Sequence, residues 1–320
     1  MLLRFLIAVS LLGAPFAAAA QDWPSRSIRI IVPFAPGGAT DIPARLVAPK
    51  LTESLGQPVV IENRTGAGGI IGIQAAAKSD PDGYTMLMAT NAEVVMHPTI
   101  YPKLPYDPQK DFTPVSIMLE SPMLLVTSAS SSFNSLGDII AAAKAKPGSV
   151  TYSTAGTGST SHVLTEMLAQ QAGIKLLHVP YKGGAPASAA AASGEVAFAL
   201  LNLGSALNFV KGGKAKALAV TSAKRHPNFP DWPTAGEAGI SGFNEAIWIG
   251  MFAPAGVRKE IVDRMSAELA KALRAPDVRE RLVSLGNEPL GTTPDEAAAR
   301  IKRESPRYGA AIKQANIRAE

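Results

Sequence analysis

Thr154-Ala155-Gly156-Thr157-Gly158-Ser159-Thr160-Ser161-His162 is a loop sequence that follows a short strand-like run, Val150–Ser153, and precedes a helical run, Glu166–Ala172. Such a junction leaves the first backbone N–H groups of a helix without intrahelical partners. Its glycines let a ligand approach the backbone closely. An anion at this point would meet N–H donors, hydroxyl groups and the positive end of the helix dipole. The stretch therefore predicts an anion-binding loop in an α/β fold.

A second loop of the same kind, Pro33-Phe34-Ala35-Pro36-Gly37-Gly38-Ala39-Thr40-Asp41, lies near the start of the chain. Strands and helices alternate around it, which implies a parallel sheet whose ligands sit at the carboxyl ends of the strands. This places the loop and Asn91 on one edge. We expect Asp41 to satisfy N–H donors at the helix start, because a carboxylate facing an acidic ligand would repel it. The expected elements are a strand at Ser27–Val32, a helix at Asp41–Leu55, a strand at Val59–Glu62, a helix at Ile70–Lys78 and a strand at Tyr84–Ala89.

The alternation of strand and helix resumes after Val150, which predicts a second lobe of similar construction. Two apolar strands, Thr113–Glu120 and Met123–Ser128, separated by Pro122, predict the first crossing between the lobes. Pro98–Asp111 contains four prolines and predicts a long excursion without regular helix, such as a hairpin. Two crossings form a hinge. The expected division is residues 21–123 and 226–320 for lobe 1 and residues 124–225 for lobe 2.

The amino-terminal residues have the pattern of a secretory signal peptide. Arg4 is a basic n-region, Phe5–Leu12 an apolar core, and Ala18–Ala20 a cleavage site before Gln21. The apolar run is too short to span a membrane. The chain contains no cysteine, which excludes disulfides and thiolate metal sites. We therefore expect residues 1–20 to be removed and a soluble mature protein in the periplasm.

Composition and motifs argue against several other classes of protein. The chain has 320 residues, 47% of them hydrophobic, which is ample for two domains. Its net charge of +5 comes without clusters of basic and aromatic residues, so nucleic acid is not an expected partner. In the glycine-rich run Asn63–Gly72, Ile71 occupies the third glycine position of a dinucleotide fingerprint. The histidines lack the spacing of metal ligands. We expect no cofactor and no metal.

His162 is open to more than one interpretation. It either caps or packs the first turn of the helix, or it contacts a ligand bound at the loop. Ser159 with His162 also suggests a nucleophile and its base, but no Gly-x-Ser-x-Gly elbow is present. Adjacent residues seldom form such a pair with a third orienting acid. We therefore expect the protein not to be an enzyme, with a periplasmic serine hydrolase as the alternative.

Together, these motifs resemble those of the Bug family, the extracytoplasmic substrate-binding proteins of tripartite tricarboxylate transporters. The resemblance extends over essentially the whole chain after residue 20. The stretches that carry it are Pro33–Asp41, Gly56–Arg64 with the following Gly-Ala-Gly-Gly, Pro81–Thr85, Ser153–Ser159 with His162, and His178–Gly183.

The resemblance implies an α/β, two-lobed periplasmic binding protein of type II with Venus-flytrap closure, each lobe a mostly parallel sheet flanked by helices. It also implies a carboxylate ligand between the lobes and delivery to a membrane permease. A sensory protein that presents its ligand to a membrane kinase is an alternative. Asn202 stands where many amino-acid-binding members have an aspartate, which favours a mono-, di- or tricarboxylate without an amine, including an aromatic one. We expect a monomer. The candidate ligand-binding residues are Phe34, Gly37, Gly38, Ala39, Thr40, Asn91, Thr154, Ala155, Gly156, Thr157, Gly158, His162 and Asn202.

Overall fold

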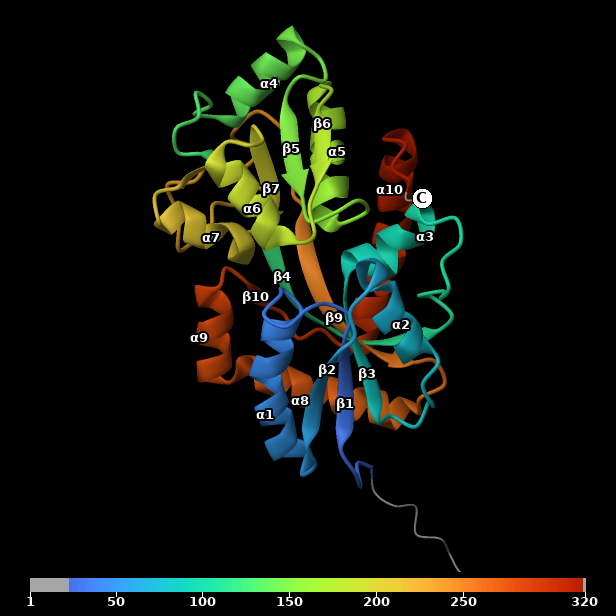
Figure 1. Ribbon diagram of the computed structural model, residues 1–320. Coiled ribbons are helices and arrows are strands. Elements are labelled where there is room, and N and C mark those ends of the chain that lie inside the picture. Colours follow the sequence, from blue (N-terminus) through green and yellow to red (C-terminus); the bar gives the residue numbers. More distant parts are fainter. Residues whose placement is uncertain (1–22, 319–320) are drawn as a thin grey trace, which may run out of the picture.

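The computed structural model describes residues 23–318, which form two α/β lobes joined by long central strands (Figure 1). The predicted signal peptide lies outside the described residues. One strand, β4 (Phe112–Ser128), runs through both lobes. The elements of lobe 1 are β1 (Ile28–Val32), α1 (Asp41–Leu55), β2 (Val59–Asn63), η1 (Ala67–Gly69), α2 (Ile70–Ala77), β3 (Thr85–Thr90), the π-helix η2 (Ala92–Met96), α3 (His97–Ile100), β9 (Ala246–Pro254), α8 (Lys259–Arg274), α9 (Pro276–Ser284), β10 (Glu288–Pro289) and α10 (Pro294–Gln314).

Lobe 2 is built from a single stretch of chain that follows β4. Its strands β5 and β6 are parallel, as are β5 and β7, whereas β4 runs antiparallel to β7 and β8. The strand order across the described sheet is β2-β1-β3-β9-β4-β7-β5-β6. The elements of lobe 2 are α4 (Leu136–Ala145), β5 (Thr151–Thr154), α5 (Thr160–Ala172), β6 (Leu177–Pro180), α6 (Gly184–Ser193), β7 (Phe198–Asn202), α7 (Leu203–Lys211) and β8 (Ala215–Val220).

Local sequence signals explain where many of these elements begin and end. α1 ends at Gly56, which adopts the left-handed conformation with φ of 71° and donates its N–H to the carbonyl of Thr52. α4 and α10 each begin with a capping box, formed by Ser135 with Asp138 and by Thr293 with Glu296. In both boxes the side chains satisfy N–H groups that the helix leaves unpaired.

The predicted pair of strands around Pro122 is in fact one continuous strand, β4. Residues up to Pro122 pair with β9, and residues from Met123 onward pair with β7 and β8. Proline cannot donate a ladder hydrogen bond, and here it lies where the strand changes partners. The returning chain crosses beside β4, because Thr221 Oγ1 accepts from Met123 N at 2.8 Å and Glu245 N donates to Thr221 O at 3.1 Å.

The predicted excursion at Pro98–Asp111 begins with helix rather than a hairpin. η2 continues directly into α3, where Pro98 lies in the first turn. Proline is tolerated there because the N–H that it lacks would have no helical partner. The prediction missed these helical turns because it treated every proline in the stretch as a helix breaker.

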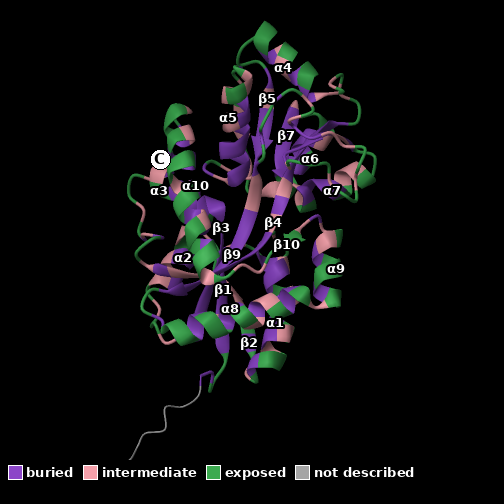
Figure 2. Ribbon diagram, turned by 180° about the vertical axis from the view of Figure 1, so that it is seen from behind, coloured by how far each residue is buried: buried purple, intermediate pink, exposed green. Residues whose placement is uncertain are grey.

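The hydrophobic core has three parts, and buried residues concentrate in the strands (Figure 2). One part packs α1 and α8 against lobe 1. Another packs α6 and α7 against lobe 2. The third is continuous across both lobes and includes residues of η2, α5 and α10. The two lobes therefore share buried apolar surface on one side of the sheet.

The carboxyl-terminal helix α10 is tied to the strands that cross between the lobes. Glu245, directly before β9, accepts hydrogen bonds from Arg307 and from Tyr308 Oη, the latter at 2.7 Å. Glu304 accepts from Trp248 Nε1 at 2.7 Å. Trp248 is fully buried. These contacts hold α10 along the hinge region.

Candidate functional site

The carboxyl ends of the parallel strands of both lobes face the middle of the molecule (Figure 1). In lobe 1, β1 leads into the loop from Phe34 to Asp41, and β3 leads into Asn91. In lobe 2, β5 leads into the loop from Thr154 to Gly158, and Asn202 ends β7. The candidate residues are thus at equivalent positions in the two lobes, as expected for parallel sheets.

Asp41 organises the loop of lobe 1. Its buried carboxylate accepts hydrogen bonds from Gly37 N at 2.8 Å, Arg45 Nε at 2.9 Å and Asn63 Nδ2 at 2.8 Å. Burial would raise the pKa of Asp41, but these hydrogen bonds outweigh it and hold the pKa below its ordinary value. Asp41 satisfies an N–H of the loop rather than one of the helix, and its charge is neutralised by Arg45.

Two donors remain unused where this loop enters α1. The backbone N–H groups of Ala39 and Thr40 form no hydrogen bond to any group within residues 23–318. Thr40 Oγ1 is buried and also has no partner in that range. Buried polar groups are normally hydrogen-bonded, so a ligand at this place would complete the bonding of the loop.

The glycine-rich run after β2 packs against the first loop. A Cβ at Gly69 would lie 3.2 Å from Phe34 Cζ, and one at Gly72 would lie 2.9 Å from Pro33 Cα and 2.5 Å from the carbonyl oxygen of Arg64. Only glycine fits so closely against a neighbouring chain. These glycines therefore bring Phe34 into position, which accounts for a motif that resembles a dinucleotide fingerprint but lacks its spacing.

The loop of lobe 2 is held by the first turn of α5. Ser159 caps the helix and donates its hydroxyl to Gly156 O at 2.6 Å, while Ser161 Oγ accepts from Ala155 N at 3.0 Å. Gly156 N donates to Thr154 Oγ1 at 3.2 Å. Most of the loop N–H groups predicted to bind an anion are thus bonded to protein atoms.

Three N–H groups remain at this loop. Those of Thr157, Thr160 and Ser161 form no hydrogen bond with another residue of the described chain. Thr157 is exposed. The free donors lie at the amino-terminal end of α5, where the helix dipole favours negative charge. The sequence predicts an anion-binding site at this loop, but it could not show which N–H groups the side chains of α5 would occupy.

His162 and His178 form a stacked pair beneath the loop. Their ring centroids are 3.8 Å apart with an angle of 10° between the planes. His162 Nδ1 accepts the N–H of Gly158 at 3.2 Å, and His178 Nε2 lies 2.7 Å from Thr154 Oγ1. Burial lowers the pKa of His162 to about 3, with a contribution from His178, and burial lowers that of His178 to about 4. Both rings are therefore neutral at neutral pH.

Asn91 is engaged by protein groups from two other elements. Its Nδ2 donates to Ala246 O at 3.0 Å, and its Oδ1 accepts from Thr160 Oγ1 at 2.9 Å. Asn91 is fully buried. The residue predicted to contact a ligand thus connects β3 of lobe 1 to the start of α5 in lobe 2.

Tyr101 is a residue of this region that sequence reasoning missed. A Cβ at Gly158 would lie 3.4 Å from Ile100 Cγ2 and 3.7 Å from Tyr101 Cε2, and one at Gly68 would lie 3.6 Å from Tyr101 Oη. Tyr101 therefore lies between the glycine-rich run of lobe 1 and the loop of lobe 2. Its position depends on the short helix α3, which has no periodic pattern in the sequence.

Asn202 lies at the end of β7 beside the start of α6. Its Oδ1 accepts from Ser205 Oγ at 2.6 Å. A Cβ at Gly184 would lie 3.5 Å from the same oxygen, and one at Gly204 would lie 3.5 Å from Asn202 Nδ2. The side chain is partly exposed and brings no charge to this edge of lobe 2.

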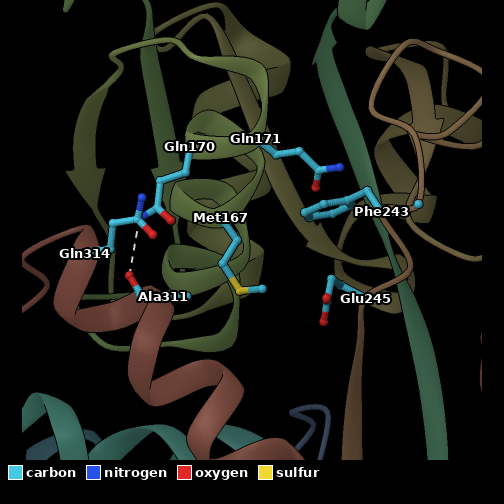
Figure 3. Close-up of a pocket in the computed structure, with 8 residues that line it drawn as sticks. Met167, Gln170, Gln171, Phe243, Glu245, Ala311 and Gln314 are labelled. Atoms are coloured by element: carbon cyan, nitrogen blue, oxygen red, sulfur yellow. Dashed lines mark hydrogen bonds between the residues drawn. The ribbon is translucent and has the colours of Figure 1, made fainter.

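A cavity of about 330 Å³ lies elsewhere, between α5, α10 and the segment before β9 (Figure 3). Gln170 Nε2 donates to Ala311 O at 3.2 Å beside it. Neither candidate loop lines this cavity. Within residues 23–318, no group of three or more metal-ligating side chains converges. In the same range, no helix is both long and apolar enough to cross a bilayer.

A two-lobed α/β protein in which loops at the carboxyl ends of the strands face each other between the lobes has the architecture of the periplasmic binding proteins. The family model described as tripartite tricarboxylate transporter family receptor, TctC, matches residues 43–317, and the chain belongs to this family of periplasmic solute-binding proteins. The predicted fold class and the resemblance to the Bug proteins are confirmed.

Three relatives illustrate this membership. The chain is 37% identical to BugT of Bordetella pertussis over 309 residues, which cover 96% of this chain and 94% of BugT. It is 36% identical to an R. palustris protein solved with adipate, with a TM-score of 0.87 and coverage of 93% and 99%. It is 34% identical to MatC from Rhodopseudomonas palustris with bound malate, with a TM-score of 0.82 and coverage of 90% and 99%.

Proposed function

We propose that this protein binds a small carboxylate without an amine group between its lobes and delivers it to the membrane permease of a tripartite transporter. The observation that supports this most directly is the set of unpaired donors at the two loops. Lobe 1 offers the N–H groups of Ala39 and Thr40, and lobe 2 offers those of Thr157, Thr160 and Ser161. Neutral donors bind a carboxylate without needing a counter-charge.

The number of donors is sufficient for useful affinity. A hydrogen bond to a charged group contributes about 1.5–3 kcal/mol net. Four or five such bonds, less the cost of association and closure, are compatible with micromolar binding, which corresponds to about 8 kcal/mol. Relatives solved with adipate and with malate support a dicarboxylate. Asn202 offers no charge to an ammonium group, which supports a ligand without an amine.

The same contacts support a role in binding rather than catalysis. Ser159 Oγ donates to Gly156 O, and His162 Nδ1 is occupied by the N–H of Gly158. A serine nucleophile requires a base that accepts its proton, and His162 has its Nδ1 turned to a backbone group instead. We propose that closure takes place where the chain crosses between the lobes, between residues 123 and 124 in β4 and, on the return, where Glu245 leads into β9.

Calorimetry and thermal unfolding with a panel of ligands test the proposal. The panel contains adipate, malate, glutamate and, as an uncharged control, adipamide. A bound ligand stabilises the fold by about 2.7 kcal/mol at one hundred times its Kd. We expect stabilisation by at least one dicarboxylate and none by adipamide. Equal effects of adipate and adipamide, or no effect of any carboxylate, would contradict the proposal.

The partner is tested separately. If the ligand is delivered to a permease, deleting the protein abolishes uptake of radiolabelled ligand by cells, and adding the purified protein to spheroplasts restores it. Unchanged uptake, together with the loss of a transcriptional response to the ligand, would instead identify a sensory protein that acts through a membrane kinase.

A further inference from the structure

We propose that His162 is a positioning residue that fixes the orientation of the Thr157–Gly158 peptide in the ligand-binding loop. The inference rests on the proposed function, because it assigns a role within that same site. It goes further, because it assigns His162 a positioning role that is distinct both from direct contact with the ligand and from packing alone.

The first step is the direction of the hydrogen bond. A backbone N–H can only donate, so Nδ1 of His162 must accept the N–H of Gly158, which lies 3.2 Å away. The ring is therefore neutral with its proton on Nε2. Burial of the ring and the neighbouring His178 disfavour a second proton, consistent with a pKa of about 3.

The second step is the freedom that the loop would otherwise have. Rotating the Thr157–Gly158 peptide by half a turn changes ψ of Thr157 and φ of Gly158. Gly158 has φ of +78°, and glycine adopts positive and negative φ with similar ease. The backbone alone therefore does not select one orientation. Removing the acceptor leaves two orientations of comparable energy. Only one of them points the N–H of Gly158 at the ring of His162 and the carbonyl oxygen of Thr157, which is antiparallel to that N–H in a trans peptide, away from it.

The third step is the support beneath His162. His178 stacks on it and lies 2.7 Å from Thr154 Oγ1, so the pair holds the loop at both Thr154 and Gly158. Tyr152 stacks on His178 and donates its hydroxyl to Glu166. The titratable groups that face His162 are thus His178 and, one layer further away, Tyr152 with Glu166. This arrangement keeps the ring in place, so that its Nδ1 can accept the hydrogen bond from the N–H of Gly158.

Two substitutions separate positioning from packing. His162→Asn keeps an acceptor near the place of Nδ1 but loses the ring, and His162→Phe keeps the ring stack but has no acceptor. Positioning predicts that His162→Phe weakens binding of the dicarboxylate selected by the panel about tenfold, the equivalent of one hydrogen bond, whereas His162→Asn stays within threefold of wild type. A role in packing alone predicts the reverse order, and that result would overturn the proposal.

Nitrogen NMR of the ligand-free wild-type protein provides a readout that does not depend on binding. We expect Nδ1 of His162 to resonate as an unprotonated acceptor and Nε2 as a protonated nitrogen. The amide of Gly158 should exchange slowly in wild type and in His162→Asn, and faster in His162→Phe at equal global stability. A protonated Nδ1 in the wild type would overturn the inference even if His162→Phe fails to fold. If that variant folds, equal exchange in all three proteins would overturn it as well. If the wild type binds no carboxylate, the proposed function fails while these NMR results still decide the role of His162.

Discussion

Thr160 in lobe 2 donates its hydroxyl to the buried carboxamide of Asn91 in lobe 1, with 2.9 Å between Oγ1 and Oδ1. Asn91 in turn donates to Ala246 O at the start of β9. The amino-terminal end of α5, which carries the free donors of lobe 2, is therefore fixed directly to the hinge side of lobe 1. Two hydrogen bonds thus link the candidate loop of lobe 2 to the start of β9 in lobe 1.

Replacing Thr160 by valine tests this link. The substitution keeps the shape of the side chain but leaves Asn91 Oδ1 buried without its partner, which costs about 1–3 kcal/mol. We expect the free energy of unfolding, measured with urea, to fall by that amount. Thr165→Val is the matched control on the same helix, because Thr165 Oγ1 donates only to Ser161 O. If both variants lose the same free energy of unfolding, the hydrogen bond between the lobes contributes no more to stability than the hydrogen bond within α5.

A negative charge at Thr157 should abolish binding of the carboxylate. Thr157 is exposed at the loop, so Thr157→Asp repels an anion while leaving the fold intact. We expect a loss of affinity of at least one hundredfold by calorimetry with an unchanged midpoint of unfolding. Ser132→Asp is the control, because Ser132 is exposed after β4, at the opposite end of the sheet of lobe 2 from the loop. Retained affinity in Thr157→Asp would exclude this loop as the site.

Asn202 is expected to influence whether the ligand can carry an amine. Asn202→Asp places a charge of the same sign beside a carboxylate ligand, and that charge can pair with an ammonium group. We expect affinity for dicarboxylates to fall about tenfold or more and the ratio of glutamate to adipate affinity to rise. Asn202→Ser is the uncharged control. An unchanged ratio in Asn202→Asp would show that this position does not face the ligand.

Stability should decrease between pH 6.5 and 4.5. Burial lowers the pKa of His97 and His178 to about 4 and that of His162 to about 3, all below the ordinary value of 6.5. The unfolded chain therefore takes up these protons first, and the stability present above pH 6.5 is lost as the pH falls. Glu93 acts in the opposite direction, because burial raises its pKa.

Urea unfolding at several pH values measures this dependence. Each neutral histidine contributes a slope of up to about 1.4 kcal/mol per pH unit. His162→Asn should reduce the slope by roughly the share of one histidine. A curve that is flat between pH 6.5 and 4.5 in the wild type would mean that the buried rings are protonated in the folded protein as readily as in the unfolded chain.

Much of the fold could be predicted from the sequence, because its signals are local. The bounds of α1 agree with the prediction, since Gly56 marks its end. The continuity of β4 through Pro122 could not be predicted, because it depends on partners that are distant in sequence. The short helix α3 was missed because Pro98 is compatible both with a first helical turn and with a break.

The candidate site could be located in sequence but not resolved into atoms. Loops that follow parallel strands are expected at one edge of a sheet, and both loops lie there. Which donors remain free depends on side chains that turn back onto the loop, such as Ser161 and His162. The contact of Tyr101 with the loop of lobe 2 depends on how the lobes meet. No local pattern encodes either relationship.

The shared strand β4 also constrains the order in which the chain can fold. In lobe 1, β9 lies between β3 and β4 and pairs with both. The chain reaches β9 only after all of lobe 2 has been synthesised, so the sheet of lobe 1 cannot close until residue 254 is available. Until then β3 and the first half of β4 keep an open edge, which is a site for mispairing. A nascent chain truncated before β9 should therefore be able to assemble lobe 2 but leave lobe 1 incomplete, so that an unfinished product is kept from acting as a competent receptor.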